Sequence, residues 1–351
     1  QSELKSIEFS EDSQLASIGS YAFSNSKIRS IFIPATVTQI EENAFYSCRK
    51  LKSIEFARNS KLKEIGINVF SNSALKSILI PSSIKEIGNY AFAYCDKLKK
   101  IEFFINSELV SINSNALVDS RIESITIPSK VVMLKEGWCS GTYSLTNILI
   151  SPKNVNFLLI DQSFIIGKSD KSKNGCFDSL AFAQRDIEKV LIPSFIQRIE
   201  PFAFNKCIQL KEIKFSDDSE LQSMGENAFS YSSIEKISIP KSVKLIEKFC
   251  FKDCSNMKKI DIQANSELNL IDKFAFYLSS IRSIFIPANV KMIEKSAFGS
   301  CIKMKIIEID ENSELKFIKK GCFGSSNLSI IMIPVNQIND IKSLFMNTFR
   351  K

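Results

Sequence analysis

The chain has 351 residues, of which 44% are hydrophobic and 24% are charged, and its formal net charge is +8. These proportions are normal for a folded protein and exclude wholesale disorder. Histidine is missing from the sequence, which excludes Ser-His-Asp and Cys-His catalysis, histidine-ligated zinc and histidine acid–base chemistry.

An Ile-Pro dipeptide recurs along the chain at a nearly constant spacing. Its prolines are Pro34, Pro81, Pro128, Pro193, Pro240, Pro287 and Pro334. Every step is 47 residues except the step from Pro128 to Pro193, which is 65 residues. An insertion of 18 residues therefore interrupts a strict period, and self-similarity of this kind is typical of a solenoid.

Each 47-residue unit contains two related coils, marked by a phenylalanine that usually follows an alanine. These residues are Phe23, Phe45, Phe70, Phe92, Phe182, Phe204, Phe229, Phe251, Phe276, Phe298, Phe323 and Phe345, at steps that alternate between 22 and 25 residues within each half of the chain. Leu117 and Cys139 occupy the two remaining positions. The array therefore has fourteen coils.

Each coil begins with apolar residues in the pattern of Ile28-Ile31-Ile33, which predicts one brief strand. Pro or an Asn-Ser or Asp-Ser pair then turns the chain. A second apolar pair, such as Val37-Ile40, leads to Ala-Phe and suggests a helical turn with the phenylalanine inside. We predict an α/β solenoid, a leucine-rich repeat array of about fourteen coils of 22–25 residues, with a parallel sheet on the concave face and short helical turns on the convex side.

The insertion divides the array. We expect an N-terminal half-array at 1–150, an insertion at 151–180 and a C-terminal half-array at 181–351, all in one continuous solenoid. Two apolar pieces, Asn156–Ile160 and Ser163–Ile166, suggest a hairpin, and a polar loop follows at 167–175. The insertion is either a binding loop or a joint between the half-arrays.

The nine cysteines do not form a disulfide framework. Cys48, Cys95, Cys207, Cys254 and Cys301 each follow the marker phenylalanine by three residues. Equivalent positions two coils apart lie about 10 Å apart, beyond the limit of about 7 Å for a disulfide. These cysteines, and Cys139, Cys250 and Cys322, are therefore predicted in the core, and the state of Cys176 stays open.

A partial column of basic residues accompanies the strands. It includes Lys52, Lys99 and Lys258, but Glu123 and Glu188 interrupt it. A lattice of ion pairs between coils explains this column better than nucleic-acid binding does.

The free position between the last two apolar residues of each strand points away from the core. In this column, charged residues alternate with apolar ones over much of the chain. We predict the following residues as possible protein-binding anchors: Phe32, Leu79, Leu191, Phe285 and Met332. The alternative is that single exposed apolar residues are ordinary in a strand.

The stretch "IPSSIKEIGNYAFAYCDKLKKIEF", Ile80–Phe103, resembles the BspA-like leucine-rich repeats of surface antigens from bacteria and parasitic protozoa. The resemblance covers essentially the whole chain. It implies a surface or secreted protein that adheres to host cells and to matrix proteins such as fibronectin and fibrinogen. The family has no catalytic residue that could be carried over.

We therefore expect a non-catalytic recognition and adhesion protein without a cofactor or metal, at the cell surface or secreted, whose partners are extracellular-matrix or host-cell surface proteins. The alternative is an intracellular leucine-rich repeat scaffold, which unpaired cysteines favour. No apolar run approaches the roughly 18 residues of a membrane helix, so this segment is not expected to insert into a membrane. Because the chain starts at Gln1 without an apolar leader, we expect either that it is a processed or trimmed piece or that targeting signals lie outside it.

Overall fold

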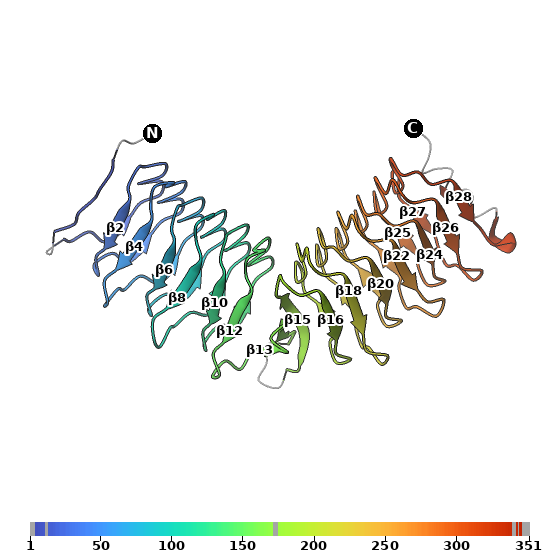
Figure 1. The fold of residues 1–351 in the computed structure, drawn as a ribbon, viewed down its shortest axis with the longest axis horizontal. Helices are drawn as coiled ribbons and strands as arrows, with labels where there is room; N and C mark the ends of the chain where they lie inside the picture. Colours follow the sequence, from blue (N-terminus) through green and yellow to red (C-terminus); the bar gives the residue numbers. More distant parts are fainter. Residues whose placement is uncertain (1–3, 11–12, 171–174, 339–341, 343, 346–351) are drawn as a thin grey trace. The chain divides into compact units, whose positions relative to one another are not determined.

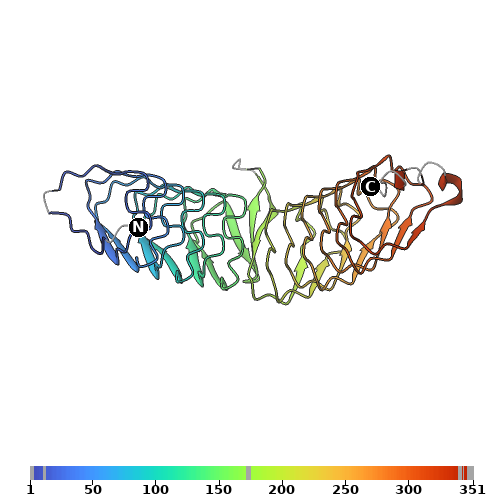
Figure 2. The same ribbon diagram turned by 90° about the horizontal axis from the view of Figure 1, so that it is seen from above.

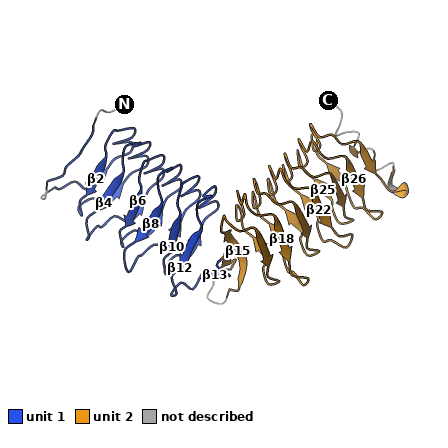
Figure 3. Ribbon diagram, viewed as in Figure 1, with its two compact units in different colours: residues 1–162, 171–173 blue, residues 163–170, 174–351 orange. Residues whose placement is uncertain are grey.

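The computed structural model describes residues 4–10, 13–170, 175–338, 342 and 344–345. The chain divides into two compact units (Figure 3). Unit 1 comprises 1–162 and 171–173, and unit 2 comprises 163–170 and 174–351. In each unit, successive coils stack so that their long strands lie side by side in chain order (Figure 1, Figure 2).

The long strands form parallel sheets. In unit 1 they are β2 (Ser30–Ile33), β4 (Ser53–Phe56), β6 (Ser77–Ile80), β8 (Lys100–Phe103), β10 (Ser124–Ile127) and β12 (Asn147–Ile150). In unit 2 they are β16 (Lys189–Ile192), β18 (Glu212–Phe215), β20 (Lys236–Ile239), β22 (Lys259–Ile262), β24 (Ser283–Ile286), β26 (Ile306–Ile309) and β28 (Ile330–Met332). Equivalent residues pair, as in Ile31 with Ile54 and Ile284 with Ile307.

A second series of short strands lies on another side of the coils. In unit 1 it contains β1 (Ser17–Ile18), β3 (Gln39–Ile40), β5 (Glu64–Ile65), β7 (Glu86–Ile87), β9 (Ser111–Ile112) and β11 (Met133–Leu134). In unit 2 it contains β15 (Phe177–Ala183), β17 (Arg198–Ile199), β19 (Ser223–Met224), β21 (Leu245–Ile246), β23 (Leu270–Ile271), β25 (Met292–Ile293) and β27 (Phe317–Ile318). The architecture is a β-solenoid of about fourteen turns with parallel sheets.

Two further strands lie within the predicted insertion at 151–180. Strand β13 (Phe157–Ile160) belongs to unit 1, and β14 (Phe164–Lys168) belongs to unit 2. Strand β14 pairs with β15 in the antiparallel sense, with Phe164 opposite Ala183 and Ile165 opposite Phe182. Unit 2 therefore begins with an antiparallel pair, and β15 then joins the parallel series through β17.

The predicted helical turns are wrong. In the Ala-Phe segment of the first coil, the N–H of Ala22 donates to Gly19 O at 3.2 Å, but the N–H of Phe23 donates to Ala44 O in the next coil at 2.8 Å. A helix would direct each N–H to a carbonyl four residues earlier in the same coil. The alternation instead ties neighbouring coils together through the backbone. Among the described residues, helical geometry is confined to the C-terminal end, at η1 (Val335–Gln337) and just after it.

Left-handed backbone conformations cause this alternation. In twelve coils the residues two positions before and two positions after the marker position have positive φ. Beside Phe70, for example, φ is 54° at Asn68 and 58° at Asn72. A run with left-handed residues four positions apart cannot continue as a right-handed helix.

The marker phenylalanines fill the interior of the coils. In unit 2 the rings of Phe204, Phe229 and Phe251 stack with centroids 5.0 Å apart, and the Phe251 and Phe276 rings are 5.1 Å apart. In unit 1 the Phe45 and Phe70 rings are 5.5 Å apart. Each unit therefore has an aromatic ladder through its core, flanked by the buried strand isoleucines.

The prediction that eight cysteines lie in the core is confirmed, since all eight are buried; Cys176 is exposed, and all nine cysteines are free. The structure adds a hydrogen-bond partner for several of them. The thiol of Cys48 donates to Phe23 O at 2.9 Å, and its sulfur lies 3.4 Å from the Ser26 hydroxyl in the preceding coil. Buried serine and cysteine thus alternate along the stack and link neighbouring coils.

Candidate functional site

The candidate site is the exposed face of the long-strand sheets. Within a strand such as β2 the isoleucines are buried and the residue between them is exposed, because successive side chains point to opposite faces. The side chain of Phe32 is 50% exposed, that of Leu79 43%, that of Leu191 60% and that of Met332 51%. Phe285 occupies the same column but is only partly exposed.

Each of these apolar side chains has a charged neighbour on the adjacent strand. Phe32 pairs with Glu55 and Leu79 pairs with Glu102 in unit 1. In unit 2, Leu191 pairs with Lys214. The parallel register therefore aligns apolar and charged side chains side by side, so that a partner would meet both kinds of group.

The structure brings Phe285 and Met332 together. Strand β26 lies between their strands, and its Glu308 pairs with both residues. They line a groove of 700 Å³ that also contains Pro334 and Val335. Phe32 and Leu79 have the same spacing, since they lie on β2 and β6 with β4 between them (Figure 1), and Leu191 lies on β16 in unit 2.

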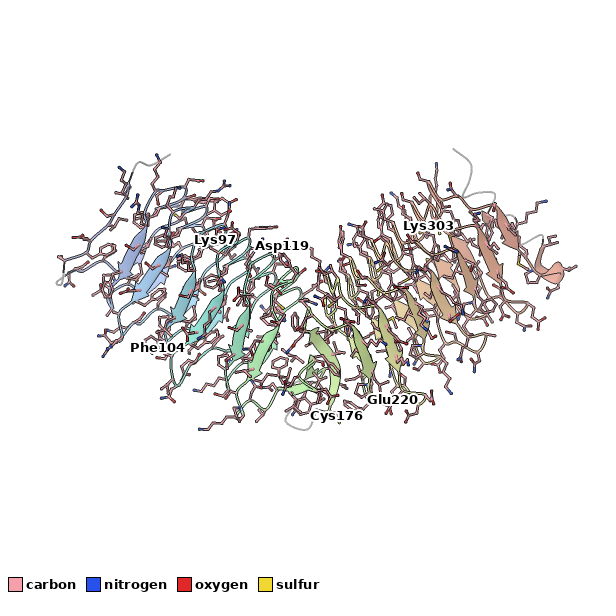
Figure 4. All side chains as sticks on the ribbon, viewed as in Figure 1. Lys97, Phe104, Asp119, Cys176, Glu220 and Lys303 are labelled. Atoms are coloured by element: carbon pink, nitrogen blue, oxygen red, sulfur yellow. The ribbon has the colours of Figure 1, made fainter. Side chains whose placement is uncertain are left out.

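A second groove, of 720 Å³, crosses β8, β10 and β12 in unit 1. Polar Ser124, Thr126 and Asn147 line it together with Leu149, whose side chain is 56% exposed. Phe104, labelled in Figure 4, borders it just after β8. Leu149 occupies the exposed position of β12 but was not among the anchors predicted from the sequence, and the groove also depends on turn residues whose positions no strand pattern reveals.

The predicted ion-pair lattice is confirmed. Lys99 Nζ lies 2.9 Å from Glu123 Oε1, and Lys258 Nζ lies 2.9 Å from Glu235 Oε2, in each case between neighbouring coils. The hydrogen bond and charge of Lys258 hold the pKa of Glu235 below its usual value. The glutamates that interrupt the basic column therefore pair with lysines of neighbouring coils, as Glu188 also does with Lys211 at 3.8 Å.

The described part of the chain contains no cluster of three or more His, Cys, Asp or Glu residues arranged to hold a metal ion. A search of the same residues finds no helix long and apolar enough to cross a membrane.

Comparison with known proteins identifies relatives of the repeat. The model of the BspA type leucine rich repeat region matches in six copies, over residues 1–99, 63–160, 177–301 and 269–350. Among curated proteins, none matches the chain.

Solved structures with a similar fold include the pneumococcal vaccine antigen PcpA, with 22% identity, a TM-score of 0.71, and coverage of 94% of this chain and 82% of that chain. A leucine-rich cell surface protein from Faecalibacterium prausnitzii has 22% identity, a TM-score of 0.64, and coverage of 93% and 86%. A leucine-rich repeat protein from Eubacterium ventriosum has 21% identity, a TM-score of 0.63, and coverage of 91% and 82%. At these identities the likeness shows a shared fold.

Proposed function

Since the chain belongs to the BspA-type leucine-rich repeat family, we propose that it is a non-catalytic recognition protein that binds protein ligands through the exposed face of its long-strand sheets. The family and its structural neighbours suggest a protein-interaction role. The ligands we propose are host-cell surface or extracellular-matrix proteins. Binding would use the anchors predicted from the sequence: Phe32, Leu79, Leu191, Phe285 and Met332.

One observation carries this proposal. The predicted anchors are exposed or partly exposed apolar side chains on this face, and each of the five stands in register with a charged residue of an adjacent strand. An interface needs apolar anchors that lose water on binding and a polar surround that fixes orientation. A stack of coils presents such groups on a broad, rigid surface.

Two double variants test the role of the face. Phe32→Ser with Leu79→Ser removes anchors from unit 1, and Phe285→Ser with Met332→Ser removes them from unit 2. Loss of a hot-spot residue costs about 2 kcal/mol or more, so we expect at least one double variant to bind immobilised fibronectin or fibrinogen at least tenfold more weakly in surface plasmon resonance.

The control for this experiment removes apolar surface from outside the face. Ile208 and Ile302 are 59% and 61% exposed and lie in turns, so Ile208→Ser with Ile302→Ser is matched in chemistry. This control should bind as the parent protein does. Equal binding by the parent and both anchor variants, or no binding of either matrix protein by the parent, would contradict the proposal.

We further propose that the protein is displayed at the cell surface or secreted. Two structural neighbours support this, one described as a vaccine antigen and the other as a cell surface protein. Membrane-impermeant biotinylation of intact producing cells should label the chain, or the chain should appear in the culture medium. Its recovery only from lysed cells would favour the intracellular scaffold.

A further inference from the structure

A groove of 440 Å³ lies along the short strands of unit 1, and its charge is strongly negative. Glu41, Glu42, Glu64 and Glu86 line it, and none of its described lining residues is a lysine or arginine. Glu64 on β5 and Glu86 on β7 stand directly opposite each other in the parallel register. Like charges in this arrangement destabilise a sheet, so the groove favours a cation.

The floor of the groove consists of bare backbone. A Cβ added at Gly88 would lie 2.7 Å from the carbonyl carbon of Gly66, which is far too close. Gly66 and Gly88 both line the groove, so two neighbouring coils meet there without a side chain. This close backbone approach forms the floor of the groove beside the carboxylates.

Two buried polar atoms in this region have no hydrogen-bond partner among the residues that the structure describes. One is Oδ1 of Asn113, which lines the groove and is only 9% exposed. The other is Oγ of Ser111, which is 1% exposed and stands opposite Glu86 in the register. Buried polar atoms without a partner cost free energy, and Oδ1 of Asn113, which lines the groove, can accept a hydrogen bond from a donor-rich cation.

At the equivalent surface of unit 2, a cation from the chain itself pairs with the carboxylates. Gln39 stands five residues after Pro34, and Arg198 stands five residues after Pro193. The guanidinium of Arg198 forms ion pairs with Glu200, at 3.5 Å from Nε, and with Glu247, at 3.2 Å from Nη2. A cation from the chain itself therefore lies between carboxylates of two coils.

The surrounding contacts are also equivalent in the two units. In unit 1 the Ser20 hydroxyl donates to Glu41 at 2.8 Å, and in unit 2 the Ser179 hydroxyl donates to Glu200. The Ser20 hydrogen bonds lower the pKa of Glu41. Unit 1 thus keeps the serine and the first glutamate, has Gln39 in place of the arginine and Gly88 in place of Glu247, and carries carboxylates at Glu64 and Glu86 instead.

We infer that the groove of unit 1 binds the guanidinium group of an arginine side chain presented by a partner protein. A planar guanidinium offers five donors in a fixed fork, which suits several carboxylates and amide oxygens better than a lysine ammonium does. Because Gln39 stands where unit 2 has Arg198, the guanidinium would have to come from a partner protein. The site lies on the short strands and selects by charge, so it goes beyond the proposed binding through the long-strand face.

The test uses the full chain and a fluorescein-labelled pentapeptide, Gly-Arg-Gly-Arg-Gly, at low salt, with fluorescence anisotropy as the readout. Matched peptides carry lysine or the neutral arginine analogue citrulline. Glu64→Gln with Glu86→Gln should weaken binding of the arginine peptide at least tenfold. Gln39→Arg should weaken it similarly and also raise the melting temperature, because it supplies the cation internally. Glu108→Gln with Glu123→Gln makes the same change in net charge elsewhere in unit 1 and should leave binding unchanged.

Several outcomes would overturn the inference. These are no binding of the arginine peptide by the parent chain, equal binding of the lysine or citrulline peptide, an unchanged affinity in Gln39→Arg, and equal losses in the control and the Glu64/Glu86 variant. Competition by free arginine at the peptide's own concentration would instead assign a small-molecule site and overturn the partner arginine. Gln39→Arg keeps the test decisive if the glutamine variant fails to fold.

Discussion

At the scale of single residues, the left-handed positions are the most demanding sites in each coil. Asn68 and Asn72 fit them well, because asparagine tolerates positive φ better than most residues. Phe249 and Phe274 occupy equivalent positions with φ of 58° although they are bulky. Their rings stack at 5.0 Å, and an aromatic pair contributes about 0.5–1.5 kcal/mol, which offsets part of the backbone strain.

Substitutions at Asn68 separate backbone strain from side-chain contacts. Asn68→Gly should change the free energy of unfolding little, because glycine adopts positive φ freely. Asn68→Val should lower it by about 1–2 kcal/mol, the typical penalty for a left-handed L-residue. Urea unfolding of both variants measures the difference.

Asn89 provides the control for this prediction, since it lies in the next coil without positive φ. Asn89→Val should cost less than Asn68→Val. Equal losses at the two positions, or an Asn68→Gly variant as unstable as Asn68→Val, would show that backbone handedness does not set the cost.

At the scale of strands and turns, periodicity identified the buried positions but not the backbone path. The alternation of Ile31 and Ile33 with exposed neighbours is a direct consequence of strand geometry, and β2 follows it. The serine of each Asn-Ser or Asp-Ser turn also has a local role, as when Ser60 Oγ accepts the N–H of Leu62 at 3.3 Å. Local chemistry of this kind can be predicted from the sequence.

The helical turns could not be predicted correctly from the same pattern. A pair of apolar residues spaced by three, such as Val37 and Ile40, fits a helix, but Ile40 belongs to the two-residue strand β3. The deciding interactions are backbone bonds to the next coil, such as Asn68 N to Asn89 O at 3.0 Å. These long-range bonds override the local preference for a helix. The residues at the left-handed positions vary from coil to coil, so the sequence gives no consistent signal of positive φ there.

The two candidate sites also differ in how far they could be predicted from the sequence. The exposed column that contains Phe32 and Leu79 could be read from strand alternation, although its binding role stays a prediction. The acidic groove beside Glu64 and Glu86 could not be foreseen, because it needs the register of the short strands and the close backbone approach at Gly88. Neither feature has a local sequence signal.

At the scale of the whole molecule, each unit depends on contacts between successive coils. An internal coil of a solenoid buries its apolar surface only against its neighbours, so a defect in one coil weakens those beside it. Buried cysteine thiols occur in coils of both units, and ionisation of any one of them would destabilise its coil. Desolvation raises the pKa of Cys95 in unit 1 to about 11, and that of Cys254 and Cys301 in unit 2 to about 12 and about 11.

These thiols should make the protein sensitive to alkaline pH. Below pH 9 they are neutral in both states, so their contribution to stability is fully present. Between pH 9 and about 11 the unfolded chain releases protons that the folded chain retains, and the free energy of unfolding falls as pH rises. Each buried thiol contributes up to about 1.4 kcal/mol for each pH unit in this window.

Urea unfolding at pH 7, 9, 10 and 10.5 measures this effect, and a variant isolates it from the titration of lysine and tyrosine. Cys95→Ala with Cys254→Ala and Cys301→Ala should be less stable than the parent at pH 7, because it leaves cavities in three coils. It should nevertheless lose less stability between pH 9 and 10.5, because it lacks three of the ionising groups. Parallel stability curves for the parent and the variant would show that the buried thiols do not set the alkaline limit.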